Sequence, residues 1–88
     1  MYLFSLVHHC IHQHLSGLHL DIDHDHEGEL IEVLDYGVFV FLPSDASFIS
    51  LYCANDEDAL IAYSFAKWFS CTFQDYGIKI DLMSNARI

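Results

Sequence analysis

The spacing of hydrophobic residues predicts a helix at the start of the chain. Over residues 2–16, apolar side chains recur at intervals of three and four residues, from Leu3 through Val7 and Ile11 to Leu15. This is the spacing of one helical face. Gly17 follows, where a residue in the left-handed conformation commonly ends a helix. We therefore expect an amphipathic helix with most of its histidines on the polar face.

Four segments after this helix have the pattern of strands. Residues 18–23 alternate between apolar and polar side chains, which predicts a half-buried strand. The polar residues 24–29 predict a turn, and residues 29–34 return as a second strand. The run VFVFL at 38–42 is continuously apolar and predicts a central strand, and residues 48–53 predict a fourth.

A second helix and a last strand complete the pattern. Asn55 and the three acids after it are typical of a helix start, and we expect the helix to extend from about Asp56 to Tyr76 and to end at Gly77. Residues 78–83 predict a fifth strand. The order is α-β-β-β-β-α-β, so we expect one α+β domain over 1–88, with two helices on one face of a mainly antiparallel sheet of about five strands.

Two phenylalanines are expected in the core of this domain. Phe69 falls on the apolar face of the second helix, and Phe41 falls in the central strand. Hydrophobic residues make up 53% of the chain, which is more than a core of this size easily encloses. The excess indicates a homodimer or a surface that binds a partner.

The charge distribution excludes several classes of partner. The chain has thirteen acidic residues and three basic ones, so its formal net charge is −10. The basic residues are Lys67, Lys79 and Arg87. A surface of this kind repels nucleic acid and anionic membranes, and it attracts basic proteins or cations. We therefore expect as partner a basic protein that itself binds nucleic acid, and we expect no direct binding of nucleic acid or membrane by this chain.

The densest acidic segment is DIDHDHEGELIE at 21–32. Its acids follow the ligand spacing of an EF-hand calcium loop, but His26 stands where that loop requires Gly, and the flanks predict strands. We therefore interpret the segment as a solvated acidic hairpin that meets a basic partner. Trp68, at the margin of the apolar face of the second helix, is a candidate anchor for that partner. The predicted partner-binding residues are Asp21, Asp23, Asp25, Glu27, Glu29, Glu32, Asp35 and Trp68.

The histidines are candidate metal ligands. His8 and His12 lie one helical turn apart, and His24 and His26 lie among carboxylates, so these four are the candidate ligands. A third fixed ligand is not evident in the sequence. We therefore predict no metal or cofactor, and we expect exposed histidines that titrate near neutral pH.

No catalytic motif is recognisable, so we expect a protein that is not an enzyme. Cys10, Cys53 and Cys71 are widely spaced in apolar runs, which is typical of free thiols in the cytoplasm.

The leading hypothesis is a small acidic protein that binds and inhibits a basic, nucleic-acid-handling protein by imitating the phosphate backbone. By analogy of size and charge alone, such proteins serve phages as inhibitors of host nucleases or as anti-CRISPR proteins. Two alternatives stay open. One is a metal-binding or metal-sensing protein built on the His/Asp hairpin, and the other is an immunity protein against a basic toxin.

Overall fold

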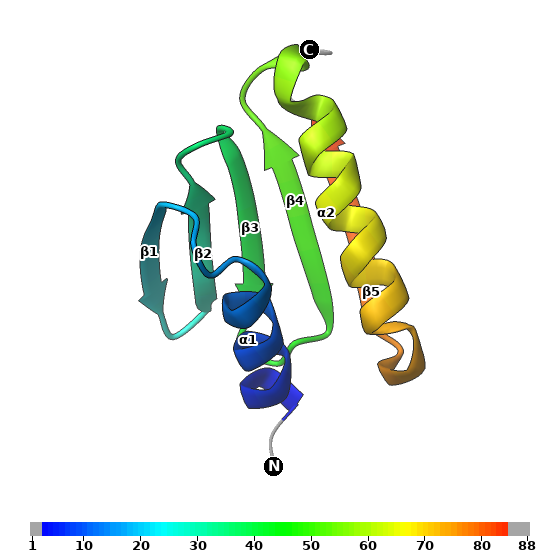
Figure 1. Ribbon diagram of the computed structural model, residues 1–88. Coiled ribbons are helices and arrows are strands. Elements are labelled where there is room, and N and C mark those ends of the chain that lie inside the picture. Colours follow the sequence, from blue (N-terminus) through cyan, green and yellow to red (C-terminus); the bar gives the residue numbers. More distant parts are fainter. Residues whose placement is uncertain (1–2, 85–88) are drawn as a thin grey trace.

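The computed structural model describes residues 3–84, and the side chains of residues 3–83. The elements in chain order are α1 (Leu3–His14), β1 (Leu20–Asp25), β2 (Gly28–Val33), β3 (Val38–Pro43), β4 (Phe48–Cys53), η1 (Asp56–Asp58), α2 (Ala59–Thr72), η2 (Gln74–Tyr76) and β5 (Lys79–Ser84). This order confirms the predicted α+β class (Figure 1).

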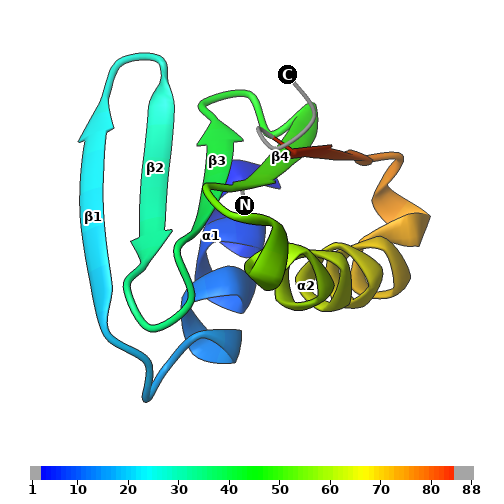
Figure 2. The ribbon, with the colours of Figure 1, turned by 90° about the horizontal axis from the view of Figure 1, so that it is seen from above.

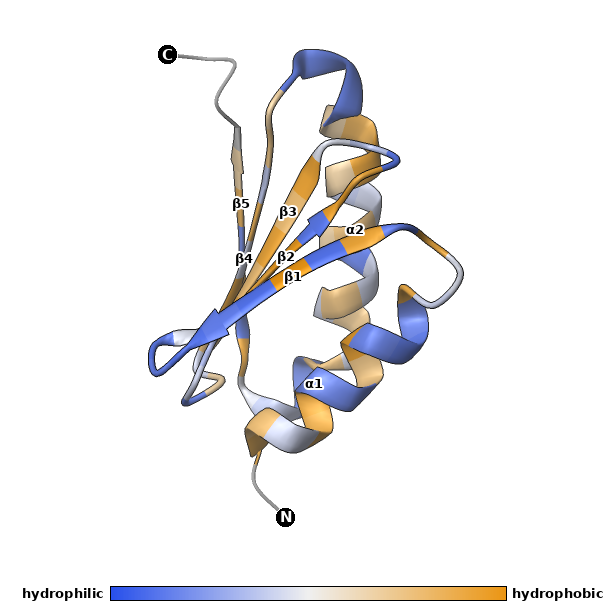
Figure 3. Cartoon of the chain, turned by 90° about the vertical axis from the view of Figure 1, so that its left-hand side faces the viewer, coloured by the Kyte–Doolittle hydropathy of each residue, from blue (hydrophilic) through white to orange (hydrophobic). Residues whose placement is uncertain are grey.

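The sheet has the strand order β1-β2-β3-β4-β5. The first four strands form an antiparallel meander, and β5 pairs with β4 in parallel because α2 carries the chain back between them. Both helices cover the same face of the sheet (Figures 1 and 2). The other face of the sheet has no layer over it among residues 3–84 (Figure 3).

The core lies between the helices and the covered face. Along β3 the residues Val38, Val40 and Leu42 are fully buried, whereas the residues between them are only half-buried. This alternation follows from the pleat, because successive side chains of a strand point to opposite faces. The helices, together with the residue that follows each of them, contribute fully buried residues at helical spacing, which are Val7, Ile11, Leu15, Ala62, Phe69 and Phe73.

The hairpin of β1 and β2 is longer and tighter than predicted. Its turn consists of His26 and Glu27 alone, and both strands extend up to it. Gly28, which opens β2, has a φ of +150°, and a Cβ there would collide with the carbonyl oxygen of Leu42 in β3. Glycine is therefore required for the close approach of β2 to β3 at this point.

The predicted continuous helix over residues 56–76 is wrong in one respect, because three elements share that range. Short 3₁₀ turns, η1 and η2, flank α2, and Gly77 ends the segment with a φ of 71° as expected. Asn55 lies at the expected start but makes no capping bond to the backbone. Instead its side-chain amide donates to Asp58 Oδ2 at 3.4 Å.

Two burial predictions are also wrong. Phe41 is half-buried rather than part of the core, because it lies on the face of β3 that no helix covers. The first strand is mostly exposed, with Ile22 41% exposed, because β1 forms the edge of the sheet farthest from α2 (Figure 2). Phe69 is fully buried, as predicted. Neither helix of the part described is long and apolar enough to cross a membrane.

Candidate functional site

The uncovered side of the sheet carries carboxylates beside a group of aromatic rings. Residues directly opposite in neighbouring strands share a face. Asp21 of β1 lies opposite Glu32 of β2, which lies opposite Phe39 of β3, which lies opposite Tyr52 of β4. We call this surface the open face. Its residues are Asp21, Asp23, Asp25, Leu30, Glu32, Phe39, Phe41, Phe48, Ser50, Tyr52, Lys79, Asp81 and Met83.

The centre of the open face is aromatic and only half-buried. The rings of Phe39 and Tyr52 are stacked, with centroids 5.1 Å apart and an angle of 9° between the planes. Phe41 and Phe48 form a second pair at 6.3 Å. Met83 at the far edge is 51% exposed.

The carboxylates form a row along the β1 edge of the open face. Asp21, Asp23 and Asp25 alternate along the strand and are all exposed, so their side chains are roughly 6.6–6.8 Å apart along it. Glu27 follows in the turn and is also exposed. Among residues 3–84, the ion pair of a lysine with a carboxylate is that of Lys79 with Asp81 at 3.8 Å, and both belong to β5 at the opposite edge. The row therefore keeps its negative charge.

A hollow of about 480 Å³ lies where the row of carboxylates meets the aromatic rings. Acids line one side of the hollow and apolar side chains line the other. Its principal lining residues are Asp23, Asp25, Glu27, Phe41, Phe48, Tyr52 and Met83. A long cationic side chain suits this arrangement, because its stem can cover the rings while its charged end meets the carboxylates.

The structure places Asp35 away from the open face. It lies in the loop between β2 and β3, where the backbone N–H of His19 donates to Oδ2 at 3.1 Å and the His19 ring contacts Oδ1 at 3.0 Å. These hydrogen bonds, the side-chain one foremost, hold the pKa of the Asp35 carboxyl below its ordinary value. Asp35 therefore fixes the entry of the chain into β1.

Trp68 also lies apart from the open face, on the helical side of the sheet. Its ring is stacked on His14 of α1, with centroids 3.6 Å apart and an angle of 11° between the planes. It also meets Phe69 and Phe73 edge-on. Trp68 is half-buried and packs against the core, so it joins the two helices.

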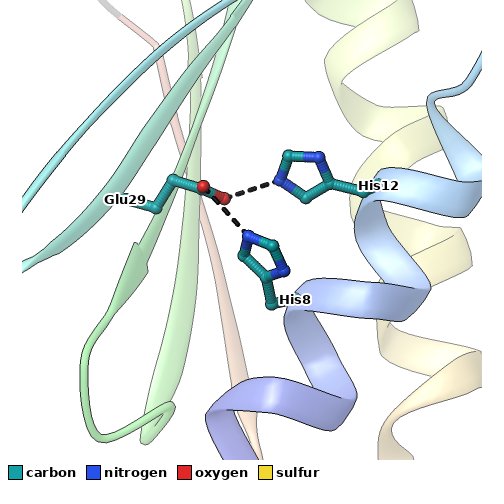
Figure 4. Close-up of polar contacts among 3 residues, drawn as sticks. All are labelled: His8, His12 and Glu29. Atoms are coloured by element: carbon teal, nitrogen blue, oxygen red, sulfur yellow. Dashed lines mark hydrogen bonds and ion pairs between the residues drawn. The ribbon is translucent and has the colours of Figure 1, made fainter.

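Glu29 is the predicted partner-binding residue whose position differs most from expectation. Its residue exposure is 5%, because its side chain leaves the covered face of β2 and points toward α1. His8 Nε2 lies 3.1 Å from Glu29 Oε2, and His12 Nε2 lies 2.8 Å from Glu29 Oε1. Figure 4 shows both rings pointing from α1 to the one carboxylate. We call His8, His12 and Glu29 the His–Glu cluster.

The helical spacing brings the two imidazoles of the cluster together. Residues four apart lie on one face of a helix, and the rings of His8 and His12 have centroids 4.2 Å apart. Phe4, one turn earlier, stacks on His8 at 5.6 Å. Contacts among the rings of Phe4, His8 and His12 along α1 therefore fix the positions of the two imidazoles.

The remaining candidate histidines lie beside the cluster. A hollow of about 640 Å³ opens between the start of α1 and the hairpin turn, and it is lined by His8, Glu29, His24 and His26 among others. His24 lies opposite Glu29 in the β1–β2 pairing, so it is on the same face of the sheet. The fold therefore brings His24 and His26 close to His8 and Glu29, a proximity that the sequence did not show.

Two features of these sites escaped prediction from the sequence. Phe41 of the open face was assigned to the core, since a continuous apolar run does not show which face is covered. Glu29 was assigned to the hairpin tip, although it alternates in phase with the buried Ile31 and Val33. That phase was the available signal. No protein-family model, curated protein or solved structure matches this chain significantly.

Proposed function

We propose that this protein binds a basic protein through its open face and blocks a surface with which that partner holds nucleic acid. The observation that supports the proposal is the row formed by Asp21, Asp23, Asp25 and Glu27 beside half-buried aromatic rings. An evenly spaced line of negative charge imitates a nucleic-acid strand, and it attracts the lysines and arginines that would otherwise contact phosphates.

The aromatic residues at the centre of the open face supply binding affinity that the charged residues alone do not provide. Exposed ion pairs contribute little to affinity, roughly 0–1 kcal/mol each, whereas aromatic side chains at the centre of an interface often dominate binding. Phe41, Phe48 and Tyr52 line the hollow beside the acids. A partner arginine in that hollow would form a charge-assisted hydrogen bond at its tip and stack its planar group on a ring.

The setting that we propose is the cytoplasm, where Cys10, Cys53 and Cys71 persist as free thiols. The source of such a protein in a phage, and a role as an anti-CRISPR or other anti-defence inhibitor, stay proposals by analogy of size and charge. An immunity protein against a basic toxin would use the same surface.

The test is capture of the partner from extracts of the native host with two matched variants. The open-face triple variant carries Asp21→Asn, Asp23→Asn and Glu27→Gln. The control triple variant removes the same charge at exposed acids of the helical side, with Asp56→Asn, Glu57→Gln and Asp75→Asn. We expect both to fold. Neutralising acids of the row relieves their mutual repulsion, and losing exposed acids near the ends of α2 removes only a weak interaction with the helix dipole.

The expected result is that wild type and control capture the same basic protein, identified by mass spectrometry, and that the open-face variant loses it. Added DNA or RNA should displace the captured protein. Capture that survives in the open-face variant, or a captured protein that nucleic acid does not displace, would contradict the proposal.

A further inference from the structure

We infer that the His–Glu cluster is a binding site for a divalent transition metal ion of the zinc class. Two imidazole nitrogens and one carboxylate, from His8, His12 and Glu29, all offer ligand atoms within 4.8 Å of one another. Two histidines and one glutamate form a ligand set that proteins use for zinc. This inference is independent of the open face, which lies on the other side of the sheet.

The geometry of the cluster is close to what zinc requires. Zinc bonds of about 2.0–2.1 Å in a tetrahedron place neighbouring ligand atoms about 3.3 Å apart. The His8 Nε2 to Glu29 Oε2 distance is 3.1 Å, and the His12 Nε2 to Glu29 Oε1 distance is 2.8 Å. Both contacts are within about half an ångström of that separation, and the three ligand atoms lie within 4.8 Å of one another. Because the two contacts end on different oxygens of Glu29, an ion held by one oxygen and both rings requires a rotation of the carboxylate or of a ring.

The burial of Glu29 gives an independent reason for a cation at this place. A carboxylate removed from water is unfavourable unless a positive charge or several hydrogen bonds compensate it. Within residues 3–84, its ion-pair partners are His8 and His12, and neither is a permanent cation. A divalent ion shared with the two neutral imidazoles supplies that charge at neutral pH.

The nature of the donors selects the class of metal. Imidazole nitrogen suits zinc, nickel, copper and cobalt, whereas calcium and magnesium prefer sites composed of oxygen ligands. A pair of histidines one helical turn apart therefore excludes calcium as the natural occupant. This assignment also differs from the EF-hand interpretation, since it uses only Glu29 of the acidic hairpin.

Three protein ligands leave one position of a tetrahedral ion open, and the hollow of about 640 Å³ that His8 and Glu29 line gives solvent access to the cluster. Three protein ligands with one exchangeable position are typical of open zinc sites, whereas structural sites are closed by four protein ligands. The bound ion should therefore accept a small ligand from solution.

The test is titration of the metal-free protein with ZnCl₂, followed by calorimetry and thermal melting. We expect one ion per chain. At a free Zn²⁺ concentration 100 times the dissociation constant, the melting temperature should rise by roughly 10–20 °C. Calcium at the same concentration should leave the melting temperature unchanged.

Substitutions of the proposed ligands show where the ion binds. His12→Gln and Glu29→Gln should each weaken zinc binding at least 100-fold, because each removes one of three ligands. His9→Gln is the matched control, since His9 is an exposed histidine on the same helix, and it should bind as the wild type does. Glutamine at 29 keeps a hydrogen-bonding amide for the two rings. If that variant fails to fold, the half-exposed His12 provides the test.

Cobalt provides a second readout. Co²⁺ in place of zinc should show the intense visible absorption of a four-coordinate ion, and azide should change that spectrum by entering the fourth position. Zinc binding that is unaffected by His12→Gln, or that is lost instead in His26→Gln, would overturn the assignment. A protein whose melting temperature is indifferent to zinc would also overturn it.

Discussion

At the scale of single residues, His14 shows how a packing contact sets the pKa of an ionisable group. Its ring lies flat on Trp68 at 3.6 Å, and partial burial lowers the pKa of His14 from its ordinary value of 6.5. The unfolded chain then binds a proton more readily than the folded one. The stabilising contribution of neutral His14 is therefore present above pH 6.5, and it is lost as the pH falls from 6.5 toward the folded pKa.

An NMR titration of the imidazole signals measures this pKa directly. We expect a value below 6.5 for His14, and we expect His14→Phe, which keeps the stack without the titration, to lose less stability than the wild type on acidification. A pKa at or above 6.5 would mean that attraction between the imidazolium and the face of Trp68 outweighs burial.

At the scale of elements, the two faces of the sheet should respond differently to loss of an aromatic ring. Phe69 of α2 is fully buried against the covered face, so Phe69→Ala should cost about 3–5 kcal/mol of unfolding free energy. Phe41 of β3 is half-buried on the open face, so Phe41→Ala should cost only about 1–2 kcal/mol. Urea denaturation of both variants measures the difference. Equal losses would mean that the open face is covered in solution, as in a homodimer.

The same contrast shows how much the sequence could predict. Periodicity predicted the order of helices and strands, the position of both helices on one face of the sheet, and the burial of Phe69. It could do so because local spacing determines which residues share a face. Phe41 did not follow, since VFVFL is apolar on both faces and only the positions of α1 and α2 decide which face is covered. The continuous run indicated a central strand, and β3 is central.

The residue types of the candidate sites could be predicted from the sequence, but the contacts between residues of different elements could not. The acids of β1 were identified as one group, and they do share one face. The His–Glu cluster joins Glu29 to residues 17 and 21 positions earlier, and such a contact depends on how α1 packs on β2. The spacing of His8 and His12 was visible in the sequence, but the third ligand belonged to a different element.

At the scale of the whole molecule, part of the net charge of −10 is arranged as a line of closely spaced acids on β1 and the hairpin turn. The row on β1 and the hairpin turn projects its field from one edge of the open face, and three of the four acids in it lie on one strand face. Mutual repulsion among these acids lowers the stability of the isolated protein. A basic partner would remove that repulsion, and the attraction would act mainly on the association rate.

The association rate of the captured partner, measured across a series of salt concentrations, tests the central claim most directly. For the wild type, we expect a rate that falls steeply as salt increases. The open-face triple variant should associate at least about tenfold more slowly at low salt and should show a flatter dependence, whereas the control triple variant should keep most of the rate and slope of the wild type. If both variants change the rate and slope equally, or if neither does, net charge or another surface mediates binding, and the proposed role of the open face is contradicted.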